Sequence, residues 1–336
     1  MNNEENSVWI CWENHRRSRE LAKYTGAKFC LFTLDAPRWL RYPYLLFKTG
    51  FFILKTKPSI VFCQNPSIVL TFFLALIKKI MGYRLVVDRH SNFKVEYSDS
   101  KKLKWRVFHC LSKYTIKYSD FTIVTNDHLK ELVEKMGGDA FVLQDKIPDM
   151  PLAFERHPPA FMNYEFPSFH AMVVSTFSSD EPISEILEAA LSLPSDFRLY
   201  FTGNYQKRFT ENERNRLKES QVILTGFISE GDYQALMYYS DVVIILTLKD
   251  DILNCGSYEA VALEKPMILS DTKLIKSYFR KGCLYTDSNP DNIFNNIIFS
   301  KKNNEKLKCD LVNFKPYLIE AWSEKFNNLQ KKINSS

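Results

Sequence analysis

The chain has 336 residues, 45% hydrophobic and 25% charged, which is typical of a globular protein long enough for two domains and excludes a disordered one. Its seven cysteines are scattered without a Cys-x-x-Cys pair, which favours a reducing compartment over a disulfide framework. Residues 1–150 carry 24 Lys and Arg against 15 Asp and Glu (net +9), so we expect an anionic partner for this half, such as a phospholipid surface, a lipid diphosphate or nucleic acid.

Short apolar runs and helical patterns alternate through the first half. The start MNNEENS is too polar for a signal peptide. Strands are predicted at 8–12, 28–34, 59–64, 84–90, 121–126 and 140–146, and helices between them at 16–24, 40–55, 67–80, 103–118 and 128–136. The apolar run at 67–77 is about half of the roughly 20 residues that a membrane-spanning helix needs. This half therefore predicts a parallel sheet covered by helices on both faces, in a domain at 1–150.

The pattern breaks at 146–169, where five prolines and no clean period predict a linker, placed at 151–169. The alternation then restarts. Strands are predicted at 170–177, 197–203, 221–226, 242–248, 266–270 and 283–286, and helices near 181–193, 210–219, 230–239, 257–264, 273–280 and 290–299. We expect a second domain at 170–311 and a closing amphipathic helix at 312–334. The predicted fold class is α/β, with two Rossmann-like, doubly wound parallel-sheet domains that face each other across a cleft.

The most informative segment is DILNCGSYEAVALEKP, at 251–266. Asp251 and Glu259 are separated by seven residues and flank a turn of small residues that begins at Asn254. A strand before this turn and a helix after it leave unpaired backbone N–H groups and the positive end of a helix dipole at the turn, which attract anions. Glu259, expected in the first turn of the helix, can accept hydrogen bonds from sugar hydroxyls. The segment predicts a site for a nucleoside diphosphate, and the alternative is an ordinary capped helix.

This spacing resembles the acidic-x7-Glu signature of GT-B glycosyltransferases, with Asp251 in place of the usual Glu. The segment 222–247 resembles the same family's strand, Gly-aromatic turn, short helix and Ser-Asp pattern. Residues 322–324, within the closing helix, resemble the terminal helix of GT-B proteins that crosses back onto the first domain. The resemblance implies a donor-binding set of Thr176, Gly203, Lys207, Phe227, Ile228, Asp251, Asn254, Cys255, Gly256, Ser257 and Glu259.

Two further segments carry narrower resemblances. Residues 63–92 resemble the first half of chitobiosyl-diphosphodolichol mannosyltransferases, and 173–187 resembles their first C-domain strand and loop. In the general pattern of family-four glycosyltransferases, an Arg and a Lys in that loop hold the diphosphate. Neither residue type occurs between Ser175 and Ile183. Lys207 or Arg208 is expected to supply the charge instead.

Candidate catalytic groups follow two predicted strands of the first half. His90 ends one strand, where a neutral imidazole can accept the proton of an attacking hydroxyl, and Asp88 is placed to orient it. Glu96 is a rival base. The alternative for His90 is a histidine whose ring is satisfied by neighbouring backbone.

The loop after the first strand supplies a second set of candidates. Glu13 is a candidate base, and His15, Arg16 and Arg17 are predicted to bind the acceptor, the two arginines through phosphate. The alternative is a solvated, basic helix start.

Residues 38–57 interleave five cations with aromatic residues, which suits an anionic membrane surface. The alternative is a core helix with a solvated face. Asp-x-Asp, Gly-x-Gly-x-x-Gly and P-loop motifs do not occur, and the histidines lack zinc spacing, so we expect no metal and no cofactor.

The leading hypothesis is a metal-independent glycosyltransferase, cytoplasmic and peripheral on the membrane, that moves a sugar from a nucleotide to a glycan or lipid-diphosphate acceptor in surface polysaccharide assembly. Nucleic acid is not the expected partner. The alternatives are a nucleotide-sugar epimerase of the same fold, a non-catalytic partner subunit that keeps the fold, and a nucleic-acid-binding protein. Whether the sugar is transferred with inversion or retention stays open.

Overall fold

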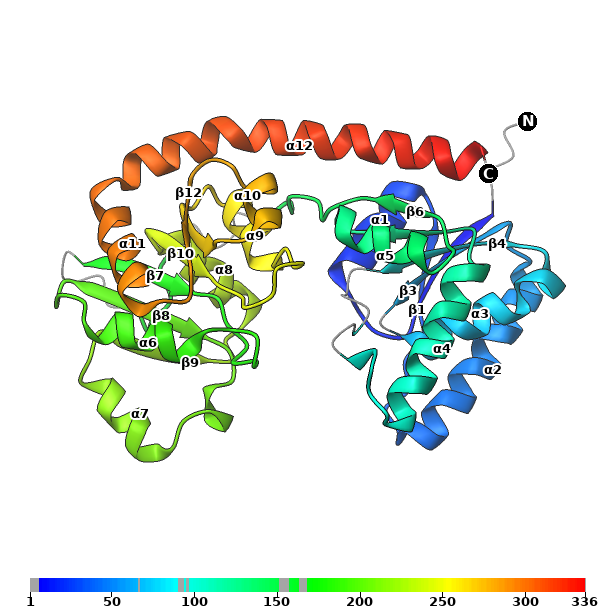
Figure 1. The fold of residues 1–336 in the computed structure, drawn as a ribbon, viewed down its shortest axis with the longest axis horizontal. Helices are drawn as coiled ribbons and strands as arrows, with labels where there is room; N and C mark the ends of the chain where they lie inside the picture. The colour runs from blue at the N-terminus through cyan, green and yellow to red at the C-terminus, as the bar shows by residue number, and fades with distance from the viewer. Residues whose placement is uncertain are drawn as a thin grey trace. The chain divides into compact units, whose positions relative to one another are not determined.

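The computed structural model describes residues 6–65, 67–89, 94, 97–150, 157–162 and 168–335. The chain divides into two compact units (Figure 1). Unit 1 comprises Met1–Asp145 with Trp322–Ser336, and unit 2 comprises Lys146–Ala321. Two predicted residues, His90 and Glu96, lie outside the described residues.

Unit 1 contains a six-stranded parallel sheet in the order β2-β1-β3-β4-β5-β6. Its strands are largely buried apolar runs, as expected for a parallel sheet covered on both faces. One core lies between the sheet and α2 and α3, and another lies under α1 and the last turns of α12. The strands are β1 (Ser7–Cys11), β2 (Lys28–Leu31), β3 (Ile60–Asn65), β4 (Arg84–Arg89), β5 (Phe121–Val124) and β6 (Ala140–Val142), and the helices are α1 (Arg16–Thr25), α2 (Arg38–Thr56), α3 (Ile68–Met81), α4 (Leu103–Tyr118) and α5 (Asp127–Lys135).

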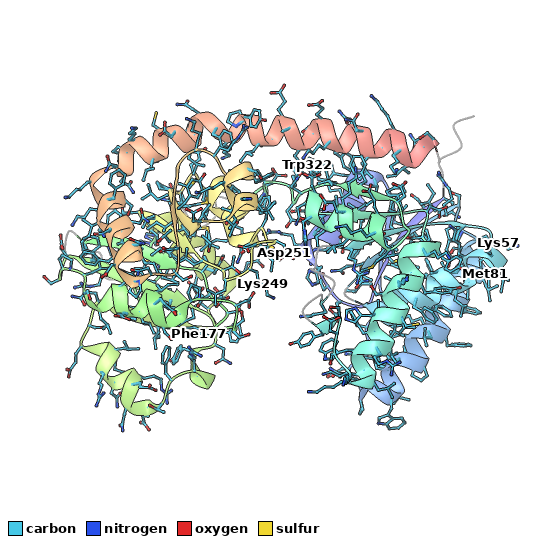
Figure 2. All side chains as sticks on the ribbon, in the orientation of Figure 1. Lys57, Met81, Phe177, Lys249, Asp251 and Trp322 are labelled. Carbon is cyan, nitrogen blue, oxygen red and sulfur yellow. The ribbon has the colours of Figure 1, made fainter. Side chains whose placement is uncertain are left out.

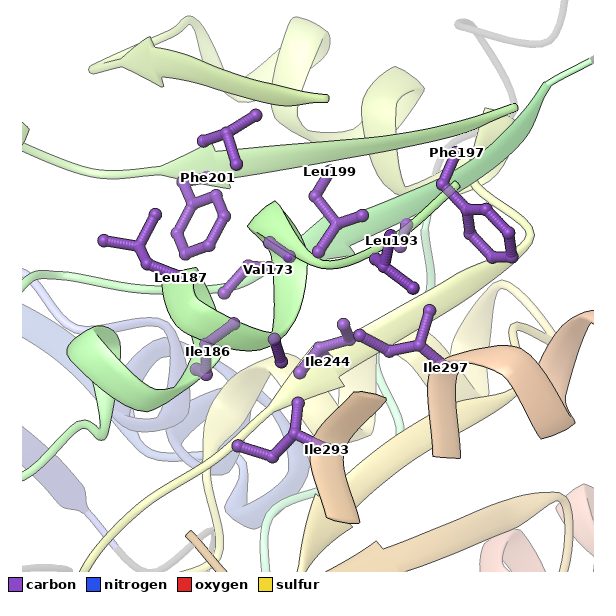
Figure 3. Close-up of a cluster of buried hydrophobic side chains, with 14 of the residues drawn as sticks. Val173, Ile186, Leu187, Leu193, Phe197, Leu199, Phe201, Ile244, Ile293 and Ile297 are labelled. Carbon is purple, nitrogen blue, oxygen red and sulfur yellow. The ribbon is translucent and has the colours of Figure 1, made fainter. Parts of the chain in front are cut away.

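Unit 2 contains a second six-stranded parallel sheet, in the order β12-β11-β10-β7-β8-β9. Figure 3 shows the core on one face, where side chains such as Val173 and Leu199 of the sheet meet Ile186 and Ile293 of helices α6 and α11. The strands are β7 (Phe169–Val173), β8 (Phe197–Thr202), β9 (Val222–Gly226), β10 (Val242–Ile245), β11 (Met267–Ser270) and β12 (Cys283–Thr286). The helices are α6 (Ile183–Leu191), a 3₁₀ turn (Tyr205–Lys207), α7 (Glu211–Lys218), α8 (Glu230–Tyr239), α9 (Cys255–Ala262), α10 (Lys273–Tyr278), α11 (Pro290–Lys302) and α12 (Asn304–Ser335).

Each sheet has one point where the strand order reverses. Counted within unit 2, the order is 3-2-1-4-5-6, the Rossmann order, and it reverses between β7 and β10. In unit 1 the order reverses between β1 and β3. Ligands of doubly wound sheets bind outside the carboxyl ends of strands at such switch points. The loops after β7 and β10, and those after β1 and β3, are therefore the places to look for sites.

Helix α12 is longer than the sequence predicts, because it begins at Asn304 rather than at 312. Pro316 suggests a helix start, since proline is favoured in a first turn, but here it lies inside the helix. Leu311 and Leu318 of α12 belong to a core of unit 2, and Trp322 and Phe326 belong to a core of unit 1. The two halves of this helix thus complete two different cores.

Candidate active site

The start of α9 forms one wall of the switch point in unit 2. Asn254 precedes the helix, and its side chain makes no capping hydrogen bond. No acidic side chain in the first turn offsets the positive end of the helix dipole, while the N–H of Ser257 donates to the Asn254 carbonyl oxygen over 3.0 Å. Gly256 and Ser257 are buried, and a Cβ on Gly256 would lie 3.0 Å from Cγ1 of Val174, which follows β7. The small residues of this turn allow α9 to approach the end of β7.

Glu259 lies in α9, but two residues deeper in the helix than predicted. The helix begins at Cys255, two residues before the predicted 257, so Glu259 is not in the first turn. Its carboxylate is partly buried and accepts a hydrogen bond of 2.9 Å from the hydroxyl of Tyr233 in α8. This contact, for which the sequence carries no signal, fixes the orientation of one carboxylate oxygen. Asp251, which is labelled in Figure 2, is partly buried and lies in the segment between β10 and α9.

The loop after β7 packs tightly on the loop after β8. Gly203 has a φ of +97°, and a Cβ there would lie 3.1 Å from the carbonyl carbon of Ser175. The Ser175 hydroxyl donates to the carbonyl oxygen of Thr202 over 2.6 Å. Thr176 is exposed, and its backbone N–H and hydroxyl both donate to Glu181, at 3.0 and 2.8 Å. The loop therefore contains the acidic side chain of Glu181, whereas the family-four pattern has an Arg and a Lys in this loop.

Lys249, in the segment after β10, reaches across to this acidic loop. Its Nζ lies 3.6 Å from Oδ2 of Asp180, and the backbone N–H of Leu248 donates to the Asp180 carbonyl oxygen over 2.7 Å. Burial opposes ionisation of Asp180, but hydrogen bonding from Ser178 and the charge of Lys249 outweigh it, and the pKa of Asp180 is lowered. Lys249 was not predicted as a site residue, although it is the one basic residue in the segment 246–254.

The remaining predicted donor residues follow β8 and β9. Phe227 is 85% exposed, and Ile228 is partly buried against a core. The loop that carries them is tied to the site because the N–H of Gly203 donates to the carbonyl oxygen of Gly226 over 3.2 Å. The backbone of Lys207 ends the 3₁₀ turn, while the next residue, the exposed Arg208, donates to the hydroxyl of Ser184 over 3.0 Å.

A small cavity of about 70 Å³ lies at the switch point of unit 1. Glu13, exposed in the loop after β1, lines it together with residues from the loop after β3 and from α2. The neighbouring Trp12 is fixed by a hydrogen bond of 3.1 Å from its ring nitrogen to the Thr49 hydroxyl. The cavity is lined by Trp12, Glu13, Arg41, Tyr42, Leu45, Ser67, Ile68 and Val69. A larger cavity, of about 690 Å³, lies beside β9 and α7, and none of the predicted site residues lines it.

Arg17 is not placed like a surface phosphate ligand. Its guanidinium is buried and donates to both oxygens of Asp88, at 3.0 and 3.1 Å, to Asp145 at 2.6 Å and to the Leu143 carbonyl oxygen at 2.9 Å. These charges raise the pKa of Arg17 despite the opposing effect of burial. The same contacts occupy the Asp88 carboxylate, which was expected to orient His90. The structure therefore argues against a phosphate-binding role for Arg17 and indicates a structural ion cluster. The orienting role of Asp88 stays a prediction, because His90 lies outside the described residues.

The other two predicted acceptor residues are nearer the surface. His15 precedes α1 and makes no side-chain cap, and Arg16 is partly exposed with Glu20 at 4.0 Å. Among the residues that the structure describes, no cluster of His, Cys, Asp and Glu is arranged to hold a metal ion. No described helix is sufficiently long and apolar to cross a membrane.

The chain has the GT-B fold, which consists of two Rossmann-type parallel sheets, each covered by helices on both faces. Residues 168–311, which lie within unit 2, match the family model Glycosyl transferases group 1. No curated protein sequence matches the chain significantly.

Solved structures show the same fold over nearly the whole chain. Sucrose-phosphate synthase from Thermosynechococcus elongatus is similar at a TM-score of 0.72 and 12% identity, covering 98% of this chain and 99% of that one. HepE from Anabaena, in complex with UDP, is similar at a TM-score of 0.71 and 13% identity, covering 98% and 100%. The lipopolysaccharide outer core galactosyltransferase WaaB is similar at a TM-score of 0.62 and 14% identity, covering 96% and 98%. At these identities the likeness establishes the fold.

Proposed function

We propose that this protein is a glycosyltransferase that takes a sugar from a nucleoside diphosphate, with UDP as the first donor to test. The observation that carries the proposal is the switch point of unit 2, where the uncapped start of α9 meets the loop after β7 and Glu259 lies one turn further along. The group 1 family match of the same segment supports it. HepE, which shares the fold, has been solved with UDP and with UDP-glucose.

In the proposed donor site, each group has a separate task. The N–H groups at the start of α9 face the diphosphate, because a helix N-terminus stabilises negative charge. Glu259, held by Tyr233, accepts hydrogen bonds from the ribose hydroxyls. Phe227, which is almost fully exposed, offers its ring to the nucleotide base.

The reaction is a displacement at the anomeric carbon of the donor sugar. The acceptor oxygen forms a bond to that carbon, the bond from the carbon to the diphosphate oxygen breaks, and the diphosphate leaves with the electron pair. The proton of the acceptor hydroxyl goes to a base, for which Glu13 and His90 are the candidates. The departing charge is stabilised by the α9 dipole and by basic side chains, in keeping with the expectation that no metal is needed.

The acceptor is proposed to bind unit 1 at the switch point beside Glu13, with His15 and Arg16 nearby. The basic character of residues 1–150 favours a phosphate-bearing acceptor, and the resemblance of 63–92 to mannosyltransferases keeps a glycan on a lipid diphosphate as the leading class. Surface polysaccharide assembly is the corresponding role.

Helix α2 supports a peripheral position on an anionic membrane. Trp39, Phe47 and Phe51 are 76%, 74% and 60% exposed on it, among five cations in 38–57. The neighbouring α3, whose Phe73 ring lies against Gly50, adds the exposed Leu76 and Ile80. An aromatic and basic face of this kind fits the headgroup region of a bilayer.

A binding screen tests the donor assignment. We expect UDP, among UDP, GDP, ADP and CDP, to raise the melting temperature of the protein. Glu259→Ala should lower the affinity for UDP by about tenfold or more, since hydrogen bonds to a charged group are lost. Glu188→Ala, an exposed site on α6, is the control and should bind as the wild type does. A flat response to every nucleotide would contradict the proposal.

The alternatives give different products. A nucleotide-sugar epimerase would convert UDP-N-acetylglucosamine with no acceptor present, and a non-catalytic subunit would bind UDP but release none from any UDP-sugar. The proposed transferase releases UDP from a UDP-sugar only when an acceptor is supplied.

A further inference from the structure

A diphosphate at the switch point of unit 2 requires a cation, and the sequence restricts where it comes from. The loop after β7 contains no Lys or Arg between Ser175 and Ile183, and contains Asp180 and Glu181 instead. The loops after β8 and β10 contribute Lys207, Arg208 and Lys249. Lys249 contacts the loop after β7, because its ammonium lies 3.6 Å from Asp180, whereas Arg208 donates to Ser184, just beyond this loop.

We propose that Lys249 binds the diphosphate of the donor, and that Lys249 forms an ion pair with Asp180 until the donor binds. This inference rests on the proposed function, because it takes the ligand of the switch point to be a nucleoside diphosphate. The carboxylate of Asp180 stands where a phosphate oxygen would be bound. Donor binding is then an exchange, in which the diphosphate replaces a carboxylate that belongs to the chain.

The geometry of the pair favours such an exchange. A separation of 3.6 Å exceeds the 2.7–2.9 Å or so of a direct charge-assisted hydrogen bond. Both side chains are partly exposed, at 32% and 30%, where ion pairs contribute little to stability. A diphosphate carries more charge than one carboxylate and also meets the N-terminus of α9, so it competes well for Lys249.

Asp180 is held in place without Lys249. The hydroxyl of Ser178 donates to its carboxylate, and the backbone N–H of Leu248 donates to its carbonyl oxygen over 2.7 Å. The carboxylate of the neighbouring Glu181 accepts a hydrogen bond from the backbone N–H of Thr176 in the same loop. The loop thus places one carboxylate beside Lys249 and another beside the N–H of Thr176, and removal of one of them should favour binding of the diphosphate.

The inference predicts opposite effects for the two partners. Lys249→Gln should weaken UDP binding by about tenfold and remove the preference for UDP over UMP, while uridine, which has no phosphate, binds equally to both proteins. Asp180→Asn should tighten UDP binding about threefold or more, because the competing carboxylate is gone while Ser178 can still hold the amide oxygen.

Titration calorimetry with UDP, UMP, uridine and inorganic pyrophosphate tests this on the full chain. Lys301→Gln is the matched control, since Lys301 forms a similarly exposed ion pair with Asp196, before the amino end of β8. Its UDP affinity should equal that of the wild type. Melting temperatures within about 2 °C of the wild type establish that the variants are folded.

The outcomes separate the two proposals. If Lys249→Gln binds UDP as the wild type does, or Asp180→Asn binds it more weakly, the inference is wrong and the donor site survives. If the wild type binds neither UDP nor pyrophosphate, the proposed function fails and the inference fails with it.

Discussion

Gly203 occupies a backbone position in which a side chain has no room. Its φ of +97° is disfavoured for residues with a Cβ, and a Cβ there would press on the carbonyl group of Ser175 and lie 3.2 Å from Cα of Thr176. Both neighbours are backbone, which cannot rotate away as a side chain can. The shape of the loop after β7 therefore depends on this glycine.

We expect Gly203→Ala to destabilise the protein by about 1–3 kcal/mol and to weaken UDP binding, since the loop must move. Urea denaturation and calorimetry measure the two effects. Gly231→Ala is the matched control: it lies in the exposed start of α8, where Ala is favoured over Gly by roughly 0.5–1 kcal/mol. Equal stability changes in both variants would contradict this account of Gly203.

Arg17 has a structural role that its sequence position conceals. Two adjacent arginines at a helix start suggest a solvated, basic surface, but Arg17 lies one turn before Leu21, on the buried face of α1. The helical period was a usable signal. What the sequence did not show is that Asp88 and Asp145, far away in the chain, would meet its guanidinium.

Arg17→Leu should destabilise the protein by about 3–5 kcal/mol, because the buried Asp88 loses its partner. In the double variant with Asp88→Asn, part of this loss should be recovered, since the uncompensated charge is removed. Arg16→Leu, at the partly exposed pair with Glu20, should cost less than about 0.5 kcal/mol. Chemical denaturation measures all three, and a near-neutral Arg17→Leu would favour a surface role in acceptor binding instead.

At the scale of elements, the sequence predicts each of the twelve strands found in the described residues, because buried parallel strands consist of short apolar runs. The ends were less accurate. The apolar run at 242–248 was read as strand to its end, yet β10 stops at Ile245, and the backbone N–H of Thr247 donates to the Ser270 hydroxyl over 2.7 Å. The site segment is longer than predicted for that reason, by residues 246–248, which precede Lys249.

The C-terminal half of α12 is held to unit 1 mainly by aromatic side chains. Trp322 is 5% exposed, its ring stacks on Phe326 at 5.1 Å and meets the edge of Tyr24 at 5.3 Å. Its ring nitrogen donates to the Gln144 carbonyl oxygen over 3.0 Å. Figure 2 labels Trp322 on this helix.

Trp322→Ala should cost about 3–5 kcal/mol in the stability of unit 1, through the cavity it leaves and the lost hydrogen bond. Hydrogen exchange, read out separately for α1 and α9, should show faster exchange in the first and no change in the second. Tyr317→Ala, at a half-exposed position of the same helix, is the control and should leave both unchanged. Equal loss of protection in both units after Trp322→Ala would contradict the local role.

At the scale of the whole molecule, composition and periodicity were enough to predict two doubly wound sheets, whereas the partners of side chains were not. Which sheet edge holds a ligand follows from strand order, and strand order is set by tertiary pairing that one sequence does not reveal. The pairing of Lys249 with Asp180 and of Tyr233 with Glu259 are contacts of this kind.

The exposed aromatic face of α2 makes a further prediction about the molecule as a whole. The protein should float with vesicles that contain phosphatidylglycerol, since each cation near an anionic surface contributes about 1 kcal/mol, and added salt should weaken the binding. The double variant Phe47→Glu with Phe51→Glu should lose vesicle binding. Phe299→Glu, half-exposed in unit 2, should retain it.

Binding to nucleic acid rather than to a membrane is the competing outcome. Tight, salt-sensitive binding to oligonucleotides at moderate salt, with no vesicle flotation, would show that the positive charge of residues 1–150 serves a different polyanion.

Since the C-terminal half of α12 supplies core side chains to unit 1, the first half of the polypeptide is not self-sufficient. A fragment that ends at Asp145 would expose the apolar surface that Trp322, Phe326 and Leu329 normally seal, and would be expected to aggregate when expressed alone. When this fragment is co-expressed with one that starts at Lys146, the C-terminal half of α12 on the second fragment can cover the exposed surface. The C-terminal half of α12 thus makes this chain a candidate for a split protein, in which the first fragment folds only when the second is present.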